Sequence, residues 1–250
     1  MFVDTHCHFE KQYYDNFDEI ITNAKNNNVG MLIASGCSKT SNVEALNLAN
    51  EYENIYTTIG FHPDQAEIVT YEDLMELEEQ IKSSKKVVGI GEIGLDYHYE
   101  GYIKEHQFDL FEKQLLLAQK YHLPVVIHSR DAVQDTIDML QKYHVKGVIH
   151  SFSGSFEVAK IYLNMGFKLG INGVVTFKNC NLKDTLVKLS PSDIVLETDA
   201  PYMTPHPFRG EKNESKNITI TADFVANIFN ITSQELAKIT RENVRQIFDI

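Results

Sequence analysis

Short runs rich in β-branched residues alternate with segments of helical periodicity along the whole chain. The runs are almost continuously apolar, as in VVGIGEIG, PVVIH and DIVLE, which is typical of strands buried on both faces of a parallel sheet. In the segments between them apolar residues recur at steps of three and four, as Phe108, Phe111 and Leu115 do. The expected strands cover residues 2–8, 30–36, 55–62, 87–96, 124–130, 147–153, 168–175 and 194–201.

About eight such strand–helix units predict a (β/α)8 TIM barrel, an α/β fold formed as a single domain over residues 1–250. A doubly wound open sheet is the alternative, but no GxGxxG motif follows the first strand. No composition shift or long linker divides the chain, and the one long irregular stretch, 201–217, follows the last expected strand. Helices are expected to begin after Ser38, Asp131 and Thr232.

The composition narrows the class of protein. A formal net charge of -12 argues against a protein that coats nucleic acid through a basic face, although it allows an enzyme that holds divalent cations in an acidic cleft. Three widely spaced cysteines argue against a disulfide framework and fit a reducing compartment. No apolar run is long enough to span a bilayer, and the first residues lack the basic region of a signal peptide. We therefore expect a cytoplasmic protein with no membrane partner.

Residues that bind metals or transfer protons follow the expected strands at their C-terminal sides. In a barrel these ends converge on one mouth, so residues far apart in sequence are expected to share a site. A histidine at one strand end is ordinarily just a polar residue at a boundary, and the set carries more weight than any member. The residues in question are His6, His8, His62, Glu92, Asp96, His128, His150, Glu197 and Asp199.

Six of these residues form a plausible metal-binding set. His6 and His8 are two positions apart, so in a strand both side chains point to the same face. Four histidines and two acids are too many for one tetrahedral zinc, but they suit two divalent ions, Zn, Mn or Mg, bridged by Glu92. The sequence therefore predicts a two-metal hydrolase acting on phosphate esters or amides. The predicted ligands are His6, His8, Glu92, His128, His150 and Asp199, with Glu92 and Asp199 as the catalytic residues.

Other polar residues have weaker claims. Arg130 follows His128 by two positions and could hold a phosphate, or it could pair with Asp131 or a neighbouring helix. Arg209 and Lys212 in the loop after the last strand could add positive charge or simply lie at the surface. Roles that orient ligands or contact substrate are open to Asp4, Asp96 and Glu197, and a substrate contact is open to His62. The histidines assigned to the surface are His106, His122 and His144; His98 and His206 lie in loops without an assignment, and Cys7 is expected to point away from the metals.

Six motifs occur in order across nearly the whole chain: DTHCH, GFHP, GEIGLDY, PVVIHSRDA, HSFSG and ETDAPY. Together they resemble the TatD family of metal-dependent hydrolases, within the amidohydrolase-like TIM barrels. The resemblance implies that His6 and His8 bind one metal and that Glu92 bridges to the second. It also implies that His128 and His150 bind that second metal, and that Asp199 binds metal and handles the proton.

Members of the family are described as deoxyribonucleases, often 3′→5′ exonucleases that use Mg or another divalent ion. The resemblance therefore implies DNA as the substrate, as single strands or 3′ ends, and it leaves the oligomeric state open. Hydrolysis of an amide, a lactone or an aminoacyl ester on the same scaffold stays an alternative, as does a metal-binding interaction protein that has lost catalysis. One departure is that Ser215 follows Asn213-Glu214 where the family commonly has proline, which puts the shape of that loop in doubt.

Overall fold

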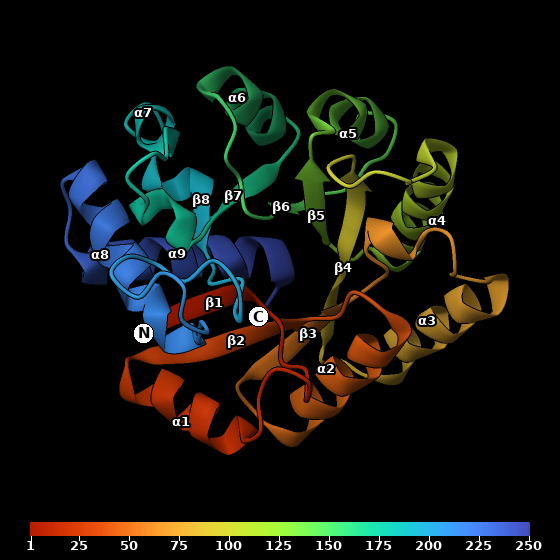
Figure 1. Cartoon of the computed structure of the whole chain (residues 1–250), viewed down its shortest axis with the longest axis horizontal. Coiled ribbons are helices and arrows are strands. Elements are labelled where there is room, and N and C mark those ends of the chain that lie inside the picture. Colours follow the sequence, from red (N-terminus) through yellow and green to blue (C-terminus); the bar gives the residue numbers. More distant parts are fainter.

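The computed structural model describes residues 1–250, in which eight parallel strands form one sheet in the order β1 to β8 (Figure 1). Each strand pairs with the next strand along the chain, so the connections have the repeating pattern of a (β/α)8 barrel. The predicted single-domain barrel is confirmed. The strands are β1 (Phe2–Cys7), β2 (Val29–Ser35), β3 (Ile55–Ile59), β4 (Val87–Asp96), β5 (Val125–Arg130), β6 (Gly147–Ile149), β7 (Phe167–Ile171) and β8 (Ile194–Leu196).

Helices surround the strands on the outside of the barrel (Figure 1). None of them is both long enough and apolar enough to cross a lipid bilayer. The α-helices are α1 (Phe17–Asn26), α2 (Lys39–Glu51), α3 (Tyr71–Ser83), α4 (Lys104–Tyr121), α5 (Val133–Leu140), α6 (Phe156–Asn164), α7 (Leu182–Leu186), α8 (Ile218–Phe229) and α9 (Ser233–Phe248). The short 3₁₀ helices are η1 (Pro63–Gln65), η2 (Gly173–Thr176), η3 (Pro191–Asp193) and η4 (Ser215–Asn217).

The first and last strands meet and nearly close the barrel. An isolated parallel bridge joins Cys7 to Ala200, just beyond the end of β8. The His8 amide donates to the Ala200 carbonyl at 2.7 Å, and the Asp199 amide donates to the His6 carbonyl at 2.9 Å. These bonds join His6–His8 to Asp199–Ala200, so the closing seam of the barrel runs through residues predicted to bind metal.

The end of the barrel opposite to the predicted metal ligands is closed by α9, which packs against β1 and β8. The Asn243 side chain anchors this helix by donating to the carbonyls of Ile194 at 2.7 Å and Pro191 at 3.0 Å. Apolar side chains from the strands and from α9 pack together in a cluster that fills the base of the barrel, which leaves the mouth for polar side chains. The cluster consists of Val3, Ile33, Val88, Val126, Val148 and Val195 from the strands with Val244, Ile247 and Phe248 from α9.

Several strands end earlier than predicted, because the residues that follow them turn out of the sheet into loops or short helices. The third strand ends at Ile59 rather than at residue 62, and His62 instead caps η1. The sixth and eighth strands end before His150 and Asp199, which occupy the turns that follow. Ser38 and Thr232 cap helices as predicted, whereas Asp131 does not, because the chain there has a φ of 54° and Ala132 precedes α5.

Candidate metal centre

All six predicted ligands meet at the mouth of the barrel. Their burial differs little: His6 is completely buried, His8, Glu92, His150 and Asp199 are at most 7% exposed, and the His128 side chain is 17% exposed. Ionisable groups at this density are costly to bury unless they pair with one another or bind cations. The six come from β1 and the residue after it, from β4 and β5, and from the turns after β6 and β8.

One group of ligand atoms is centred on the two N-terminal histidines. The Nε2 atoms of His6 and His8 lie 3.1 Å apart. Glu92 Oε2 is 3.4 Å from His6 Nε2, and Asp199 Oδ1 is 3.4 Å from His8 Nε2. Two imidazole nitrogens and two carboxylates thus face one another from three parts of the chain.

A second group faces the other oxygen of Glu92. Glu92 Oε1 lies 2.7 Å from His128 Nδ1 and 3.8 Å from His150 Nε2. His150 Nε2 is also 3.8 Å from Asp199 Oδ1, which links the two groups. The two carboxylate oxygens of Glu92 therefore contact different sets of imidazoles, which is the placement expected of a bridging ligand.

Three of the histidines are oriented by a contact at their other ring nitrogen. His8 Nδ1 lies 3.1 Å from the Ser35 carbonyl and can only donate to it, which leaves Nε2 without a proton in the neutral ring. His128 Nε2 lies 3.0 Å from Asp96 Oδ2, so its Nδ1 is the atom presented to Glu92. His150 Nδ1 lies 2.9 Å from Glu197 Oε1. Such contacts fix ring orientation and increase the basicity of the nitrogen that faces the metal.

The Glu197 side chain reaches His150 through space left by a glycine. Glu197 Oε1 also accepts a hydrogen bond from the Ser151 amide at 2.7 Å. A Cβ atom on Gly170 in β7 would lie 2.3 Å from Glu197 Oε2, much closer than two such atoms can approach. A residue with a side chain at position 170 would therefore displace Glu197.

The charges of the cluster lower the pKa values of its two carboxyl groups and raise those of His128 and His150. Burial favours the neutral form of Glu92, but His150 and His6 outweigh it and hold the pKa of Glu92 well below its usual range. For Asp199, burial is likewise outweighed by His150 and His8, so its pKa is lowered. Burial alone would lower the pKa of His128, but Asp96 and Glu92 raise it to about 9. The pKa of His150 is raised to about 10 against burial by Glu197 and Glu92.

These donor atoms fit a divalent transition-metal cation. The Nε2 atoms of His6 and His8 are too close to face each other in the same protonation state without a partner between them. His6 Nδ1 is buried and has no hydrogen-bond partner, so the polar contacts of this ring are all made by Nε2. Imidazole nitrogens together with carboxylate oxygens are a common donor set for Zn²⁺, Mn²⁺ or Fe²⁺. The assignment of these six residues as ligands stays a prediction, with a geometry that suits it.

His62 lies beside the centre but outside the six. Its ring centroid is 4.4 Å from that of His128, and its Nδ1 is 3.0 Å from Asp64 Oδ1. His62, Asp96 and His128 themselves form a further group whose ligand atoms lie within 4.8 Å of one another. Asp96 is the last residue of β4, where the strand expected over residues 87–96 also ends.

The two predicted substrate arginines are exposed at the rim. Arg130 lies over the Tyr99 ring at 5.2 Å and donates to its hydroxyl at 3.3 Å. It makes no ion pair with Asp131, which instead pairs with His98 at 2.9 Å. The guanidinium of Arg209 lies 4.5 Å from the centroid of the Phe177 ring.

Asp4 and Cys7 belong to β1, and their side chains contact residues on or just beyond the neighbouring strands rather than the ligand atoms. Asp4 accepts hydrogen bonds from the Thr198 amide at 2.9 Å and the Thr198 hydroxyl at 2.6 Å, and so holds the residue before Asp199. Burial outweighs these bonds and raises the pKa of Asp4 to about 7. The Cys7 thiol is completely buried and points to the Ile33 carbonyl at 3.4 Å, away from the ligands. The expected packed thiol at Cys7 is confirmed.

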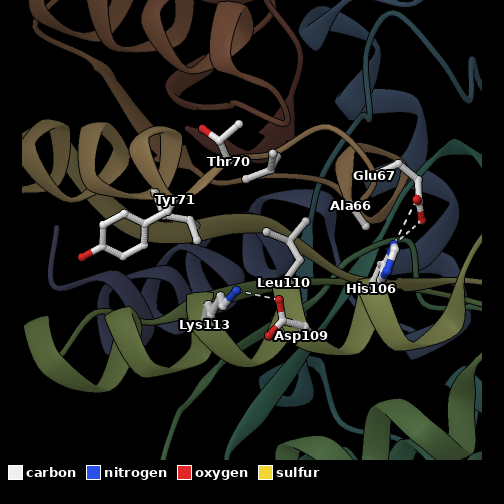
Figure 2. A pocket seen from close by; sticks show the side chains of 10 residues that line it. Ala66, Glu67, Thr70, Tyr71, His106, Asp109, Leu110 and Lys113 are labelled. Atoms are coloured by element: carbon white, nitrogen blue, oxygen red, sulfur yellow. Dashed lines mark hydrogen bonds and ion pairs between the residues drawn. The ribbon is translucent and has the colours of Figure 1, made fainter.

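A separate pocket of about 190 Å³ lies on the outside of the barrel, between α4 and the segment that joins η1 to α3 (Figure 2). His106 points toward Glu67 there, with its Nδ1 2.9 Å from both carboxylate oxygens, and Lys113 pairs with Asp109 at 2.6 Å. His106 is thus a surface residue, as predicted, and the exposed positions of His122 and His144 agree with the same expectation.

Some contributors to the site were not found from the sequence. The Ser35 carbonyl has no residue-type signal, because any residue can supply a backbone oxygen. Gly170 interrupts an apolar strand, and such a glycine often marks a close approach of another group. Tyr202 lies with its ring 6.1 Å from that of His8 and is 46% exposed, so an aromatic surface borders the centre.

Comparison with known proteins agrees with this geometry. Residues 3–249 match the family model described as TatD related DNase. The metal-dependent hydrolase YabD of Bacillus subtilis, itself uncharacterized, is 39% identical over 100% of both chains. The crystal structure of the TatD homologue YjjV from Escherichia coli covers 100% of this chain and 98% of its own, with a TM-score of 0.95 and 30% identity. A TatD family hydrolase from Entamoeba histolytica has a TM-score of 0.87 at 25% identity, covering 99% and 97% of the two chains. The chain therefore belongs to the TatD family of metal-dependent hydrolases.

Proposed function

We propose that this chain is a divalent-metal-dependent deoxyribonuclease that hydrolyses phosphodiester bonds at the 3′ ends of single-stranded DNA. The observation that carries the proposal is the position of Glu92, whose two oxygens face separate groups of imidazoles. A carboxylate shared between two cations is a recurrent arrangement in phosphodiester hydrolysis. The description of the matching family model, TatD related DNase, supports the same chemistry.

We propose two divalent ions per chain, Zn²⁺, Mn²⁺ or Mg²⁺. The histidine-rich donor set favours Zn²⁺ or Mn²⁺, whereas Mg²⁺ prefers oxygen ligands. When bound, such ions supply Lewis acidity, which lowers the pKa of a water and offsets negative charge on a phosphate. The residues that would hold them are His6, His8 and Asp199 for one ion, His128 and His150 for the other, and Glu92 for both.

Asp199 is proposed to accept the proton of the attacking water and pass it to the leaving oxygen. Its lowered pKa keeps the carboxylate ionised at neutral pH, and its Oδ1 faces both groups of imidazoles. Glu92 also stays ionised, because its pKa is lowered by His150 and His6. Its two carboxylate oxygens link the two groups of imidazoles. Arg130 makes no ion pair and is free to hold a substrate phosphate, and His62, beside His128 at the mouth, is proposed as a further substrate contact.

Aromatic side chains around the mouth suit a single strand rather than a compact amide. Tyr202 is exposed next to His8, and Tyr99 is exposed beneath Arg130. Stacking of a base on such a ring contributes about 1–3 kcal/mol and depends little on sequence. A cavity of about 230 Å³ that includes His62, Asp96 and Tyr99 adjoins the centre and could take a terminal nucleotide.

All three cysteines are unpaired, which fits the cytoplasmic location that we propose.

The test is hydrolysis by the purified chain after chelation and reloading with Mg²⁺, Mn²⁺ or Zn²⁺. We expect single-stranded DNA labelled at its 5′ end to shorten progressively from the 3′ end, with no such products from Asp199→Ala. His144→Ala removes an exposed histidine remote from the centre and is the matched control.

Two outcomes would overturn the proposal. Hydrolysis of an amide, a lactone or an aminoacyl ester without cleavage of DNA would assign another bond to the same centre. Full metal occupancy with no hydrolysis of any substrate would instead make the chain a metal-binding interaction protein.

A further inference from the structure

A third cluster of metal-ligating side chains borders the proposed hydrolytic centre on the side of β2. His8, Glu10 and Cys37 each offer a ligand atom, and these atoms lie within 4.8 Å of one another. His8 and Glu10 follow β1, whereas Cys37 follows β2, so the cluster joins two neighbouring strand ends. It differs from the six-residue centre in containing a thiol.

The thiol of Cys37 is held in place, in a residue that is only partly buried. Its residue precedes α2, and its backbone amide donates to the Ser41 hydroxyl at 2.9 Å. Cys37 Sγ lies 3.5 Å from the same hydroxyl, and Cys37 is half-buried and free of any disulfide. Glu10 is also half-buried; its Oε2 accepts from Gln12, which leaves Oε1 available. A cation from solvent can therefore reach both residues.

Only one ring nitrogen of His8 can bind a cation. Its Nδ1 lies 3.1 Å from the Ser35 carbonyl, so Nε2 is the only atom that can bind a cation. The same Nε2 faces Asp199 and Glu92 at 3.4 and 3.7 Å. One cation cannot be bound by His8 together with Cys37 while another is bound by His8 within the hydrolytic centre.

We propose that His8, Glu10 and Cys37 form a binding site for a thiophilic divalent cation such as Zn²⁺ or Cd²⁺, and that its occupation withdraws His8 from the hydrolytic centre. Thiolate, imidazole and carboxylate together are a zinc-type donor set, which Mg²⁺ does not favour. On binding, the Cys37 thiol loses its proton to solvent and no electron is transferred. Thiophilic cations in excess of those held in the hydrolytic centre thus inhibit the enzyme by displacing a ligand, while Mg²⁺ and Mn²⁺ leave this site empty. Only the inhibition depends on the proposed hydrolytic function.

The binding experiment needs no substrate. Titration of the metal-free chain with Cd²⁺ or Co²⁺ should produce a sulfur-to-metal charge-transfer absorption in the near ultraviolet. Cys37→Ser should abolish this absorption and weaken Zn²⁺ binding at least about tenfold, because loss of a direct ligand costs no less than loss of an outer partner. Cys180→Ser removes the other half-buried free thiol and should leave the absorption intact. Absorption that is absent from the wild type, or that persists in Cys37→Ser, overturns the proposal.

The inhibition is tested separately, on Mn²⁺-loaded enzyme. The activity remaining after addition of Zn²⁺, relative to the same sample without Zn²⁺, should be several-fold higher for Cys37→Ser than for Cys180→Ser. Equal inhibition of both variants would refute the withdrawal of His8 even if the absorption is found. Glu10→Gln should weaken Zn²⁺ binding in the same direction as Cys37→Ser and keep the absorption, and unchanged binding would remove Glu10 from the site.

Discussion

Glu197 reaches His150 across a strand that separates them. The two residues follow β8 and β6, with β7 between these strands, yet Glu197 Oε1 lies 2.9 Å from His150 Nδ1. The contact depends on Gly170, whose missing side chain leaves the space that Glu197 occupies. A metal-facing histidine is thus oriented by an acid from a different turn of the chain.

Replacing Glu197 with glutamine should weaken binding of the metal ion held by His128 and His150 by about 10–100-fold. A loss of this size is typical when a ligand histidine loses the charged partner at its other ring nitrogen. The fold should persist, because glutamine has nearly the same shape. Competition with a chromophoric chelator would measure the affinity, and Glu51→Gln, at the exposed end of α2, is the control. An unchanged affinity would contradict the orienting role.

Replacing Gly170 with alanine should destabilise the chain by about 1–3 kcal/mol, the usual range for forcing a group into a packed site. The new methyl group would lie 2.3 Å from Glu197 Oε2. Urea unfolding of Gly170→Ala, Glu197→Ala and the double variant measures the coupling. In the Glu197→Ala background the added methyl group should cost much less, and strictly additive losses would show that the clash is elsewhere.

Metal binding should tighten as the pH rises from about 7 toward about 10, because cations bind only the neutral imidazole. In the metal-free chain the pKa of His128 is raised to about 9 and that of His150 to about 10, so both rings are protonated at neutral pH. Binding must displace these protons. Titration calorimetry with Mn²⁺ in buffers of different ionisation enthalpy would count them, and zero proton release at neutral pH would be inconsistent with these pKa shifts.

Adjacent residues of β1 should respond differently to substitution. His6→Ala should lower metal affinity at least about tenfold, since His6 Nε2 faces the other ligand atoms. Cys7→Ser should leave the metal content per folded chain unchanged, because the Cys7 thiol points to the Ile33 carbonyl. Elemental analysis of the folded fractions distinguishes the two; equal losses would place Cys7 among the ligands.

Ser215→Pro should stabilise the chain by about 0.4–1 kcal/mol through reduced freedom of the unfolded state. Ser215 is the first residue of η4, a position where the amide lacks a helical partner and proline fits. Lys216→Pro is the contrasting variant, because proline there disfavours the helical conformation of Ser215 and should destabilise η4. The midpoints of urea unfolding compare the two, and the reverse order would refute this account.

The barrel and the convergence of the six polar residues could be predicted because both follow from local pattern. Strands buried on both faces read as continuous apolar runs, and the C-terminal ends of parallel strands share one side of the sheet. The orientation of each imidazole could not be predicted. Glu197 was among the acids expected to orient a ligand, but its pairing with His150 and the Ser35 carbonyl behind His8 are set only by strand pairing.

The ends of elements were the other part that local pattern missed. Asp131 has the residue type of a helix cap, but its positive φ and its pairing with His98 override that preference. Arg130 has several possible partners within reach, and only the folded chain selects Tyr99. In both cases competition between neighbours, rather than propensity, decides the contact.

The seam between the first and last strands has a consequence for how the protein is made. The Thr5 hydroxyl donates to the Leu196 carbonyl across 191 positions, and the amide of Asp199 is bonded to the carbonyl of His6. Contacts of such long range form only after most of the loop-closure entropy has been lost. His6 and His8 are synthesised long before β8, yet they have no complete set of neighbours until that last strand has been made. Uptake of the metal ion would therefore report that the ring of strands has closed.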